Sequence, residues 1–404
     1  MTTTTPLDLW SHDFRTGAFE TYALMRAEAP VQQVTLPDGQ TGWLVSRYED
    51  VLTALKDPRF VKDVRHALTP EEIERDPALR MLRDQVPTMI STDPPDHTRL
   101  RGLVHKAFTP RLVERLRPRI KEIADQLIDA MLPQGRADLM EAFAFPLPVT
   151  VFCELMGVPE PDRVLFREWI NGLFTFDPSQ DRHEQMAQFI QPFEHYLRDL
   201  FAQRRAHPTD DLITGLVQAE EQGDRLSEPE LIGMVMLLLV AGFETTVNLI
   251  GNGTLALLSN PQQLALLKAQ PELLEPAVEE LLRFCGPVEL VGQRFTAEPV
   301  ELSGVQLPRG AQVFLLLAAA NHDERRFERA EELDITRPDN HRHLAFGYGV
   351  HFCLGAPLAR LEGQIAFAAL LRRLPELRLD ARPDELIWKP SLGMRSLTTL
   401  PVAF

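Results

Sequence analysis

Cysteine is rare in this chain: three thiols are spread over 404 residues, at Cys153, Cys285 and Cys353. No two of them have the close, paired spacing of a disulfide framework or of a Cys-x-x-Cys redox or metal motif. A disulfide-stabilised secreted scaffold is therefore excluded. We expect a protein of a reducing compartment, the cytoplasm.

Long apolar runs are missing too. The longest, residues 234–241 and 313–320, are far shorter than the about 20 residues of a membrane-spanning helix. The first residues, MTTTTPLDLWSHDF, lack the basic start and the apolar core of a signal peptide. The sequence therefore predicts a protein without a membrane anchor.

Positive charge is scarcer than negative charge, with 42 Lys and Arg against 58 Asp and Glu and a formal net charge of −16. This balance argues against non-specific binding to nucleic acid or to anionic lipid. One stretch is nevertheless basic, because residues 97–120 combine a single acid, Glu114, with seven basic residues: Arg99, Arg101, Lys106, Arg111, Arg115, Arg117 and Arg119. A stretch of this kind is usually a solvated helix face.

Linkers, internal repeats and low-complexity tracts are absent as well. The 32 prolines are scattered as helix and turn punctuation and form no Pro-rich segment. We therefore predict one large domain over residues 1–404, with enough apolar residues to enclose a cofactor.

Most of the chain has the periodicity of amphipathic helices. The spacing predicts helices over residues 48–56, 96–108, 110–131 with an irregularity at Pro118, 146–156, 184–205 and 356–374. Residues 31–35 and 41–45 flank the turn Leu36-Pro37-Asp38-Gly39 and predict a small hairpin. Short strands are expected near residues 300–307 and 313–317 and at the C-terminus. The predicted fold class is mainly α with minor β.

The longest predicted helix starts at Ser227, where Glu230 completes a capping box, and it ends before Pro261. Its centre, LLLVAGFETTVN, changes abruptly from apolar to polar. A glycine there leaves space, and a threonine can bond back to a carbonyl one turn earlier, so we expect the helix to open locally. Ordinary close packing with a self-satisfied threonine explains the same residues equally well.

Cys353 lies in FGYGVHFCLGAPLAR, a glycine-rich turn that leads into the helix expected from residue 356. Backbone N–H groups at the start of a helix stabilise a thiolate, and Leu354 and Gly355 stand where such donors are unpaired. The glycines of the turn let the backbone approach the sulfur, and two aromatic rings keep water away: Gly347, Gly349, Gly355, Phe346 and Phe352. The pattern is typical of a thiolate presented to a metal.

Three other interpretations of this segment stay open. A lone cysteine is more often a small buried hydrophobe than a ligand, although the glycine spacing argues against that here. A glycine-rich run can cradle a phosphate, but Phe352 stands where a dinucleotide loop has its third glycine. Zinc is the last alternative, although no Cys-x-x-Cys motif accompanies the cysteine. Its candidate ligands would be His341, His343, His351 and Cys353.

With these residues in view, the chain resembles the cytochrome P-450 family of haem-thiolate monooxygenases and looks like a soluble bacterial member. The family motif F-x-x-G-x-x-x-C-x-G is matched by Phe346, Gly349, Cys353 and Gly355, and three further motifs follow in family order over nearly the whole chain. The resemblance implies a single triangular-prism fold that encloses haem b (iron protoporphyrin IX). Cys353 would be the axial ligand of its iron, and Phe346, Gly347 and Gly355 would line the cofactor site.

A second motif of the family, A-G-x-[DE]-T, is matched by residues 241–245. The resemblance implies that Ala241 lies at the cofactor and that Glu244 and Thr245 are catalytic, delivering protons to the bound dioxygen. The third motif, E-x-x-R, is matched by Glu280 and Arg283. Together with Arg337 these two are expected to hold the haem-binding core.

Haem also brings two propionates, which must be charge-paired when they are buried. His97 and Arg101 are four residues apart and therefore share one helix face. The resemblance implies that this pair binds a propionate, together with Arg294 and with His351, the basic residue two before the cysteine. Residues 294–296 and 321–324 depart from the common family pattern, and neither segment carries iron chemistry.

The implied partners are a lipophilic small-molecule substrate, O2, and a ferredoxin reduced by an NAD(P)H ferredoxin reductase. The implied reaction is hydroxylation or epoxidation of a macrolide or other polyketide, a terpenoid, a steroid or a fatty acid. Part of the basic stretch 97–120 is expected to receive the ferredoxin. Apolar segments are expected to form the substrate pocket, at residues 61–90, 174–190, 238–241, 288–291 and 392–394.

Three other functions are weighed against this one. A peroxide-driven hydroxylase of the same fold would replace the acid-alcohol pair Glu244 and Thr245, and both are present. A haem-based sensor or carrier, a binding protein without turnover, would not need that pair. A structural helical protein with an incidental cysteine would bind no haem.

Overall fold

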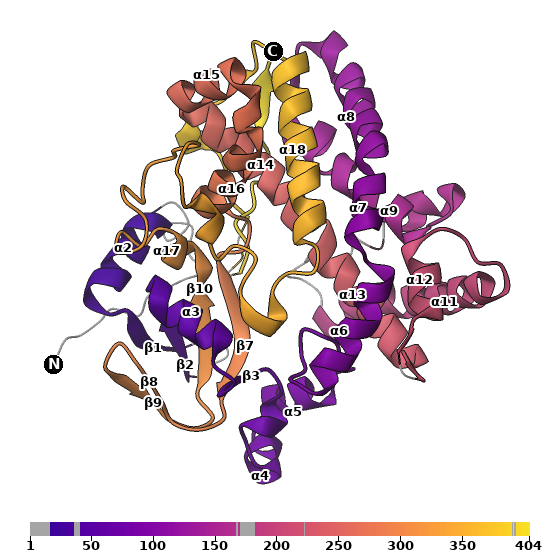
Figure 1. The fold of residues 1–404 in the computed structure, drawn as a ribbon, viewed down its shortest axis with the longest axis vertical. Coiled ribbons are helices and arrows are strands. Elements are labelled where there is room, and N and C mark those ends of the chain that lie inside the picture. Colours follow the sequence, from indigo (N-terminus) through magenta and orange to yellow (C-terminus); the bar gives the residue numbers. More distant parts are fainter. Residues whose placement is uncertain are drawn as a thin grey trace.

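The computed structural model describes residues 17–35, 41–166, 169, 182–221, 223–389, 391 and 393–404. Helices dominate, as the periodicity predicts (Figure 1). Their bounds are α2 Ala18–Glu28, α3 Tyr48–Lys56, α4 Pro70–Glu74, α5 Pro77–Asp84, α6 Asp96–Ala107, α7 Pro110–Arg115, α8 Arg117–Met131, α9 Pro146–Met156, α11 Arg182–Ala206, α12 Leu212–Gln218, α13 Glu228–Gly242, α14 Glu244–Ser259, α15 Pro261–Ala269, α16 Leu274–Cys285, α17 Leu317–Asn321 and α18 Ala356–Arg373.

The largest sheet has five strands in the order β1-β2-β10-β7-β3. Strands β1 (Val31–Thr35) and β2 (Thr41–Val45) form the predicted antiparallel hairpin, with Val31 opposite Val45. β10 (Gln312–Leu316) runs parallel to β2 and antiparallel to β7 (Leu290–Thr296), and β3 (Phe60–Val61) closes the other edge. The turn 36–40 lies outside the described residues.

The remaining strands are short. β11 (Arg378–Leu379), β12 (Pro401–Ala403) and β4 (Arg136–Asp138) form a second sheet. β5 (Glu220–Glu221) pairs with β6 (Asp224–Arg225). The strand structure expected near residues 300–307 is the hairpin of β8 (Val300–Leu302) and β9 (Val305–Leu307), whose turn was not predicted; Ser303 and Gly304 both adopt positive φ and reverse the chain there.

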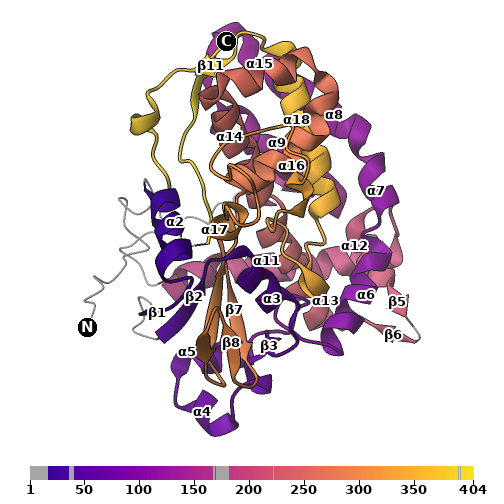
Figure 2. The ribbon, with the colours of Figure 1, turned by 60° about the vertical axis from the view of Figure 1, so that its left-hand side comes forward.

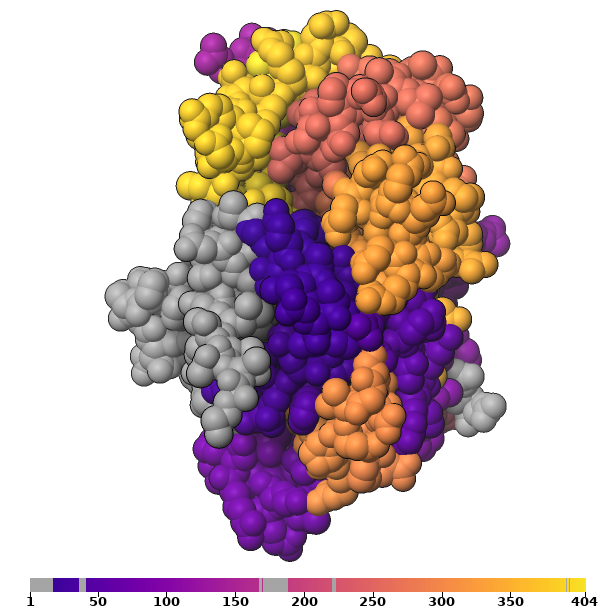
Figure 3. Space-filling view, turned by 90° about the vertical axis from the view of Figure 1, so that its left-hand side faces the viewer, coloured from indigo at the N-terminus to yellow at the C-terminus, as the bar shows by residue number. Residues whose placement is uncertain are grey.

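The two halves of the chain share the largest sheet, since N-terminal β1 and β2 pair with β10 from the second half. On the face shown in Figure 3, the N-terminal segment (indigo) adjoins the orange segments of the second half. Figures 1 and 2 show α14, α16 and α18 packed together beyond one end of this sheet. The protein therefore has a helical part, which contains α14, α16 and α18, and a part built around the five-stranded sheet, and the two parts adjoin at that end of the sheet.

Two predicted helices are interrupted. The helix over 110–131 breaks at Leu116, two residues before the expected irregularity at Pro118. A proline is tolerated in the first turn of a helix, because an N–H group there would have no partner within the helix. The new helix α8 therefore starts at Arg117, just before Pro118, and the break lies earlier than predicted. The helix from Ser227 is interrupted at Phe243, as the glycine beside it suggested.

The capping box at the start of α13 is present: Ser227 accepts from the N–H of Glu230, and the Glu230 carboxylate accepts from the N–H of Ser227. By length and composition alone, Glu228–Ser259 is apolar enough to cross a membrane. The core helix of a globular protein passes the same test, and most of α14 is buried inside this protein. This length exceeds the apolar runs counted in the sequence because it adds α13 and α14 together and includes the polar residues between those runs.

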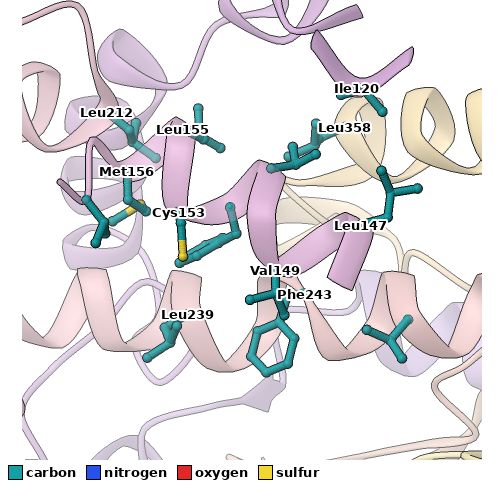
Figure 4. Close-up of a cluster of buried hydrophobic side chains, with 14 of the residues drawn as sticks. Ile120, Leu147, Val149, Cys153, Leu155, Met156, Leu212, Leu239, Phe243 and Leu358 are labelled. Atoms are coloured by element: carbon teal, nitrogen blue, oxygen red, sulfur yellow. The ribbon is translucent and has the colours of Figure 1, made fainter. Parts of the chain in front are cut away.

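A large apolar core surrounds the junction of α13 and α14. Figure 4 shows Val149 and Cys153 of α9 directed toward the helices that carry Leu239 and Phe243. The rings of Phe145 and Phe243 meet edge to face, with centroids 6.1 Å apart. Cys153 is a buried member of this core, the role of most lone cysteines. The interruption at Phe243 is thus held in place by packing on one side.

Candidate functional site

The loop before α18 wraps Cys353. The backbone N–H of Cys353 donates to the carbonyl of Phe346 over 2.9 Å, and this bond closes the loop. A 3-10 turn spans Gly349–His351. Gly347 and Gly349 have φ of +67° and +73°. A Cβ on Gly349 would lie 2.8 Å from the carbonyl oxygen of Leu55, so the loop can approach α3 only with glycine there.

The Cys353 sulfur lies among hydrogen-bond donors and cations. Burial raises the pKa of the thiol, while the backbone N–H groups of Gly355 and Ala356 and the charges of Arg101 and Arg360 act to lower it. The predicted donors were Leu354 and Gly355, so the true pair is shifted by one residue toward the helix. A metal binds the thiolate form, and these donors stabilise it. Within the described residues, no group of three or more His, Cys, Asp or Glu is placed to hold a metal ion, which leaves the zinc alternative without support.

Four basic side chains converge near this loop from distant parts of the chain. The rings of His97 on α6 and His351 lie 4.4 Å apart between centroids. Arg294 on β7 and Lys62, directly after β3, are close enough to lower the pKa of His351, which burial and these charges bring to about 3. Burial first, and then repulsion from Arg294, lowers the pKa of Lys62 to about 7. The charges of Lys62 and Arg294 thus share one nearby acid, Asp93, and a further anion would stabilise the cluster.

Buried polar atoms without a hydrogen-bond partner also indicate that this cluster binds an anion. Both ring nitrogens of His97 and the Nε of Arg294 are buried without a hydrogen-bond partner in the described part of the chain. Buried polar groups of a folded protein are almost always bonded, so the N–H groups of His97 and Arg294 fit a ligand with anionic oxygens. The residues present accordingly fit a cofactor that binds a thiolate through its metal and carries two carboxylates.

Of the four predicted propionate residues, the structure brings three together: His97, Arg294 and His351. Arg101, the fourth, is close enough to His97 to lower its pKa, and its Nη2 donates to the carbonyl of Phe352 over 2.7 Å beside the cysteine. Sequence reasoning missed Lys62. The only signal was a lysine directly after two apolar residues of a predicted pocket wall, in PRFVKD.

The interrupted helix presents the second predicted motif. Thr245 Oγ1 donates to the carbonyl of Ala241 over 2.8 Å, as expected for a threonine bonding back one turn. Gly242 packs on the ring of Phe152, where a Cβ would meet ring carbons at 3.1 Å. Burial raises the pKa of Glu244, and the charge of Lys389 partly opposes this. The motif thus combines an available hydroxyl with a carboxyl that holds its proton more tightly than usual.

The Glu-x-x-Arg pair is fully buried, as predicted. The guanidinium of Arg283 binds both carboxylate oxygens of Glu280, at 2.9 and 2.8 Å, and also donates to the carbonyls of Asn321 and Ala330. Arg337 adds contacts of 3.2 Å to the same carboxylate. The network ties α16 to the loop after α17 that leads to the cysteine.

The predicted pocket walls are only partly described, since residues 174–181 and Leu392 lie outside the described residues. In the rest, large apolar side chains stay unusually accessible: Val240 on α13 is 44% exposed, and Val86 and Ile90 are 46% and 47% exposed. Gly233 of α13 lies against Val86 and Thr88, so the segment 61–90 packs along the same helix. These surfaces are suited to an apolar ligand.

Comparison with known proteins agrees with this geometry. The family model described as cytochrome P450 matches residues 164–399. The chain is 49% identical to the cytochrome P450 monooxygenase PikC of Streptomyces venezuelae, over 99% of this chain and 95% of that protein. It is 48% identical to the vitamin D(3) 25-hydroxylase of Pseudonocardia autotrophica, over 98% and 96%. The solved structure of the polyketide synthase cytochrome P450 PksS of Bacillus subtilis 168 superposes with a TM-score of 0.91 at 44% identity, covering 98% of this chain and 99% of that one.

Proposed function

This chain belongs to the cytochrome P450 family, and from that premise we propose which of its residues and partners carry the activity. The protein is a monooxygenase with the cytochrome P450 fold; it binds haem b and inserts one oxygen atom of O2 into a lipophilic small molecule. The overall reaction consumes substrate, O2, two electrons and two protons, and yields the oxygenated product and water. When bound, haem b supplies the redox chemistry that reduces O2 and transfers one of its oxygen atoms.

The single observation that supports the site assignment is the convergence of Cys353 with the cation cluster. Cys353 is the proposed iron ligand, and the N–H groups of Gly355 and Ala356 stabilise its thiolate against the burial that raises the pKa of this thiol. Phe346, Gly347 and Gly355 shape the loop around it. His97, Arg101, Arg294 and His351 are the proposed partners of the cofactor carboxylates, and Arg101 also holds the cysteine loop from α6.

On the opposite side, Ala241, Glu244 and Thr245 are proposed to face the reacting oxygen. Thr245 Oγ1 already donates its hydrogen to the carbonyl of Ala241, so the lone pairs of this oxygen can accept a hydrogen bond from a proton donor while the side chain stays in place. Burial raises the pKa of Glu244, so this carboxyl holds a proton more tightly than an exposed one, and it is proposed to pass that proton toward the helix interruption at Phe243. The proposed role of this pair is therefore proton delivery.

The electron donor is proposed to be a ferredoxin, itself reduced by an NAD(P)H ferredoxin reductase. Its docking face would be the surface over the cysteine loop, where Tyr348 and Val350 are 45% and 51% exposed and Lys56 lies over the Tyr348 ring. The basic stretch 97–120 offers less free charge than its sequence suggests, because four of its arginines pair with acids: Arg99, Arg115, Arg117 and Arg119. Arg111 is exposed without an ion pair in the described residues and is the best candidate contact.

The substrate is proposed to be a macrolide or other polyketide, a terpenoid, a steroid or a fatty acid. The accessible Val86, Ile90 and Val240 support an apolar ligand, and the relatives named above include a polyketide and a vitamin D(3) enzyme. We further propose that residues 1–404 form one domain, supported by the sheet that joins both halves, and that the enzyme works in the cytoplasm.

The test begins with a spectral screen of the purified haem protein against these compound classes. Hits are then incubated with NADPH, a surrogate ferredoxin and its reductase under ¹⁸O2. We expect a product that carries one ¹⁸O atom and requires the ferredoxin. Product that forms with peroxide alone and not with the electron-transfer pair, or oxygen that comes from water, would contradict the proposal.

A further inference from the structure

Lys62 lies where three elements of the site meet. It follows β3 directly, and its Nζ donates to the carbonyl of Gly292 on β7 over 3.2 Å. Its backbone N–H donates to Asp93 Oδ1 over 2.8 Å. Lys62 therefore anchors the start of the segment 61–90 to the strand that carries Arg294.

The charges around Lys62 are unbalanced. Arg294 repels its ammonium, and the pairing of Val61 with Phe295 sets Lys62 beside Arg294, so the lysine belongs to the same cation cluster. Asp93 is the acid that acts on it, but the oxygens of Asp93 already accept three bonds, from the N–H groups of Lys62 and Asp63 and from His66. Within the described residues Lys62 forms no ion pair. An ammonium in this setting is stabilised by a further anion.

We propose that Lys62 is a cofactor-binding residue whose ammonium pairs with a carboxylate of haem. The inference rests on the proposed function and adds to it a residue that links the segment 61–90 of the substrate-pocket wall to the cofactor. It also accounts for the cluster as a whole, since two carboxylates bring the negative charge that Lys62, Arg294 and the two histidines lack.

A purely structural role is the competing explanation. Next to Gly292, Gln293 has a φ of +56°, and the pairing of β7 with β10 shifts register between Val313 and Leu315. A lysine that bonds the Gly292 carbonyl could simply hold this irregular strand. The two roles differ in one respect, because only the first depends on the carboxylates of haem.

The test measures haem transfer from the holoenzyme to excess apomyoglobin for wild type, Lys62→Met, Lys62→Arg and Lys268→Met. The last is a matched control, since Lys268 also donates to a backbone carbonyl, that of Pro375, but is far from the cluster in sequence and exposed. The same rates are measured after reconstitution with haem dimethyl ester, whose carboxylates carry no charge. Far-UV circular dichroism confirms that each variant is folded.

We expect Lys62→Met to lose haem about tenfold faster than wild type, the equivalent of about 1.4 kcal/mol, and to have a lower reduction potential. Lys62→Arg and Lys268→Met should behave like wild type, and the difference between wild type and Lys62→Met should vanish with the dimethyl ester. Equal rates for Lys62→Met and wild type would overturn the proposal. So would a difference that persists with the ester, or loss of folding in both Lys62 variants. A wild-type protein that binds no haem would instead refute the proposed function.

Discussion

Glu362 on α18 tests how burial controls charge in this protein. Its side chain is 2% exposed, and its Oε2 has no hydrogen-bond partner in the part of the chain that the structure describes. Burial raises the pKa of this carboxyl from 4.5 to about 8. At neutral pH, Glu362 is therefore protonated in the folded protein and ionised in the unfolded chain.

The raised pKa sets both the sign and the size of the effect. Protons bind more tightly to the folded state, so the contribution of Glu362 to stability is largest below about pH 4.5 and declines as the pH rises through about 8. The difference between 8 and 4.5 is 3.5 pH units, and at about 1.4 kcal/mol per unit the decline approaches about 5 kcal/mol. Glutamine has nearly the same shape as the protonated carboxyl and does not titrate.

We expect Glu362→Gln to match wild type in free energy of unfolding near pH 4.5, and to exceed it by about 3 kcal/mol at pH 7 and more at pH 8.5. The assay is urea unfolding of the haem-loaded enzymes, followed by far-UV circular dichroism at each pH. Glu376→Gln, at an exposed carboxyl, is the control. A difference between wild type and Glu362→Gln that does not change with pH would refute the reasoning.

Two further changes test the network and the proton pathway. Arg283→Met leaves the carboxylate of Glu280 buried with Arg337 as its remaining cationic partner in the described residues, so the free energy of unfolding should fall by about 3–5 kcal/mol. Arg372→Met, which breaks an exposed ion pair, should cost little. Equal, small losses for both variants in denaturant titrations would count against a buried network. Thr245→Ala removes the hydroxyl that donates to the carbonyl of Ala241, so NADPH consumption should exceed product formation several-fold. Thr245→Ser should restore the ratio of product formed to NADPH consumed. An unchanged ratio in the alanine variant would remove Thr245 from the mechanism.

Local sequence signals predicted much of the fold. The helices Tyr48–Lys56 and Pro146–Met156 begin and end where the spacing places them, and the capping box at Ser227 marks the start of α13. Errors arose where tertiary structure decides. The break at Leu116 came earlier than its proline suggested, and the turn within 300–307, where Ser303 and Gly304 have positive φ, was not predicted.

The site was predictable only in part, for a related reason. Cys353, His97, Arg294 and His351 stand in motifs that the sequence displays. Lys62 has no motif, because its importance comes from the pairing of β3 with β7, which brings it beside Arg294. The pairings of the basic stretch, such as that of Arg115 with Asp210, likewise join residues far apart in the sequence. Partners of this kind become visible only in the folded chain.

The central claim is that the sulfur of Cys353 binds the haem iron. The most direct measurement is the absorption spectrum of the purified holoenzyme after reduction and exposure to carbon monoxide, compared with that of Cys353→Ser. We predict a strongly red-shifted Soret band in the wild type, the mark of a thiolate ligand opposite carbon monoxide, and its loss in the serine variant. A folded, haem-loaded wild type without that band, or a serine variant that keeps it, would contradict the account.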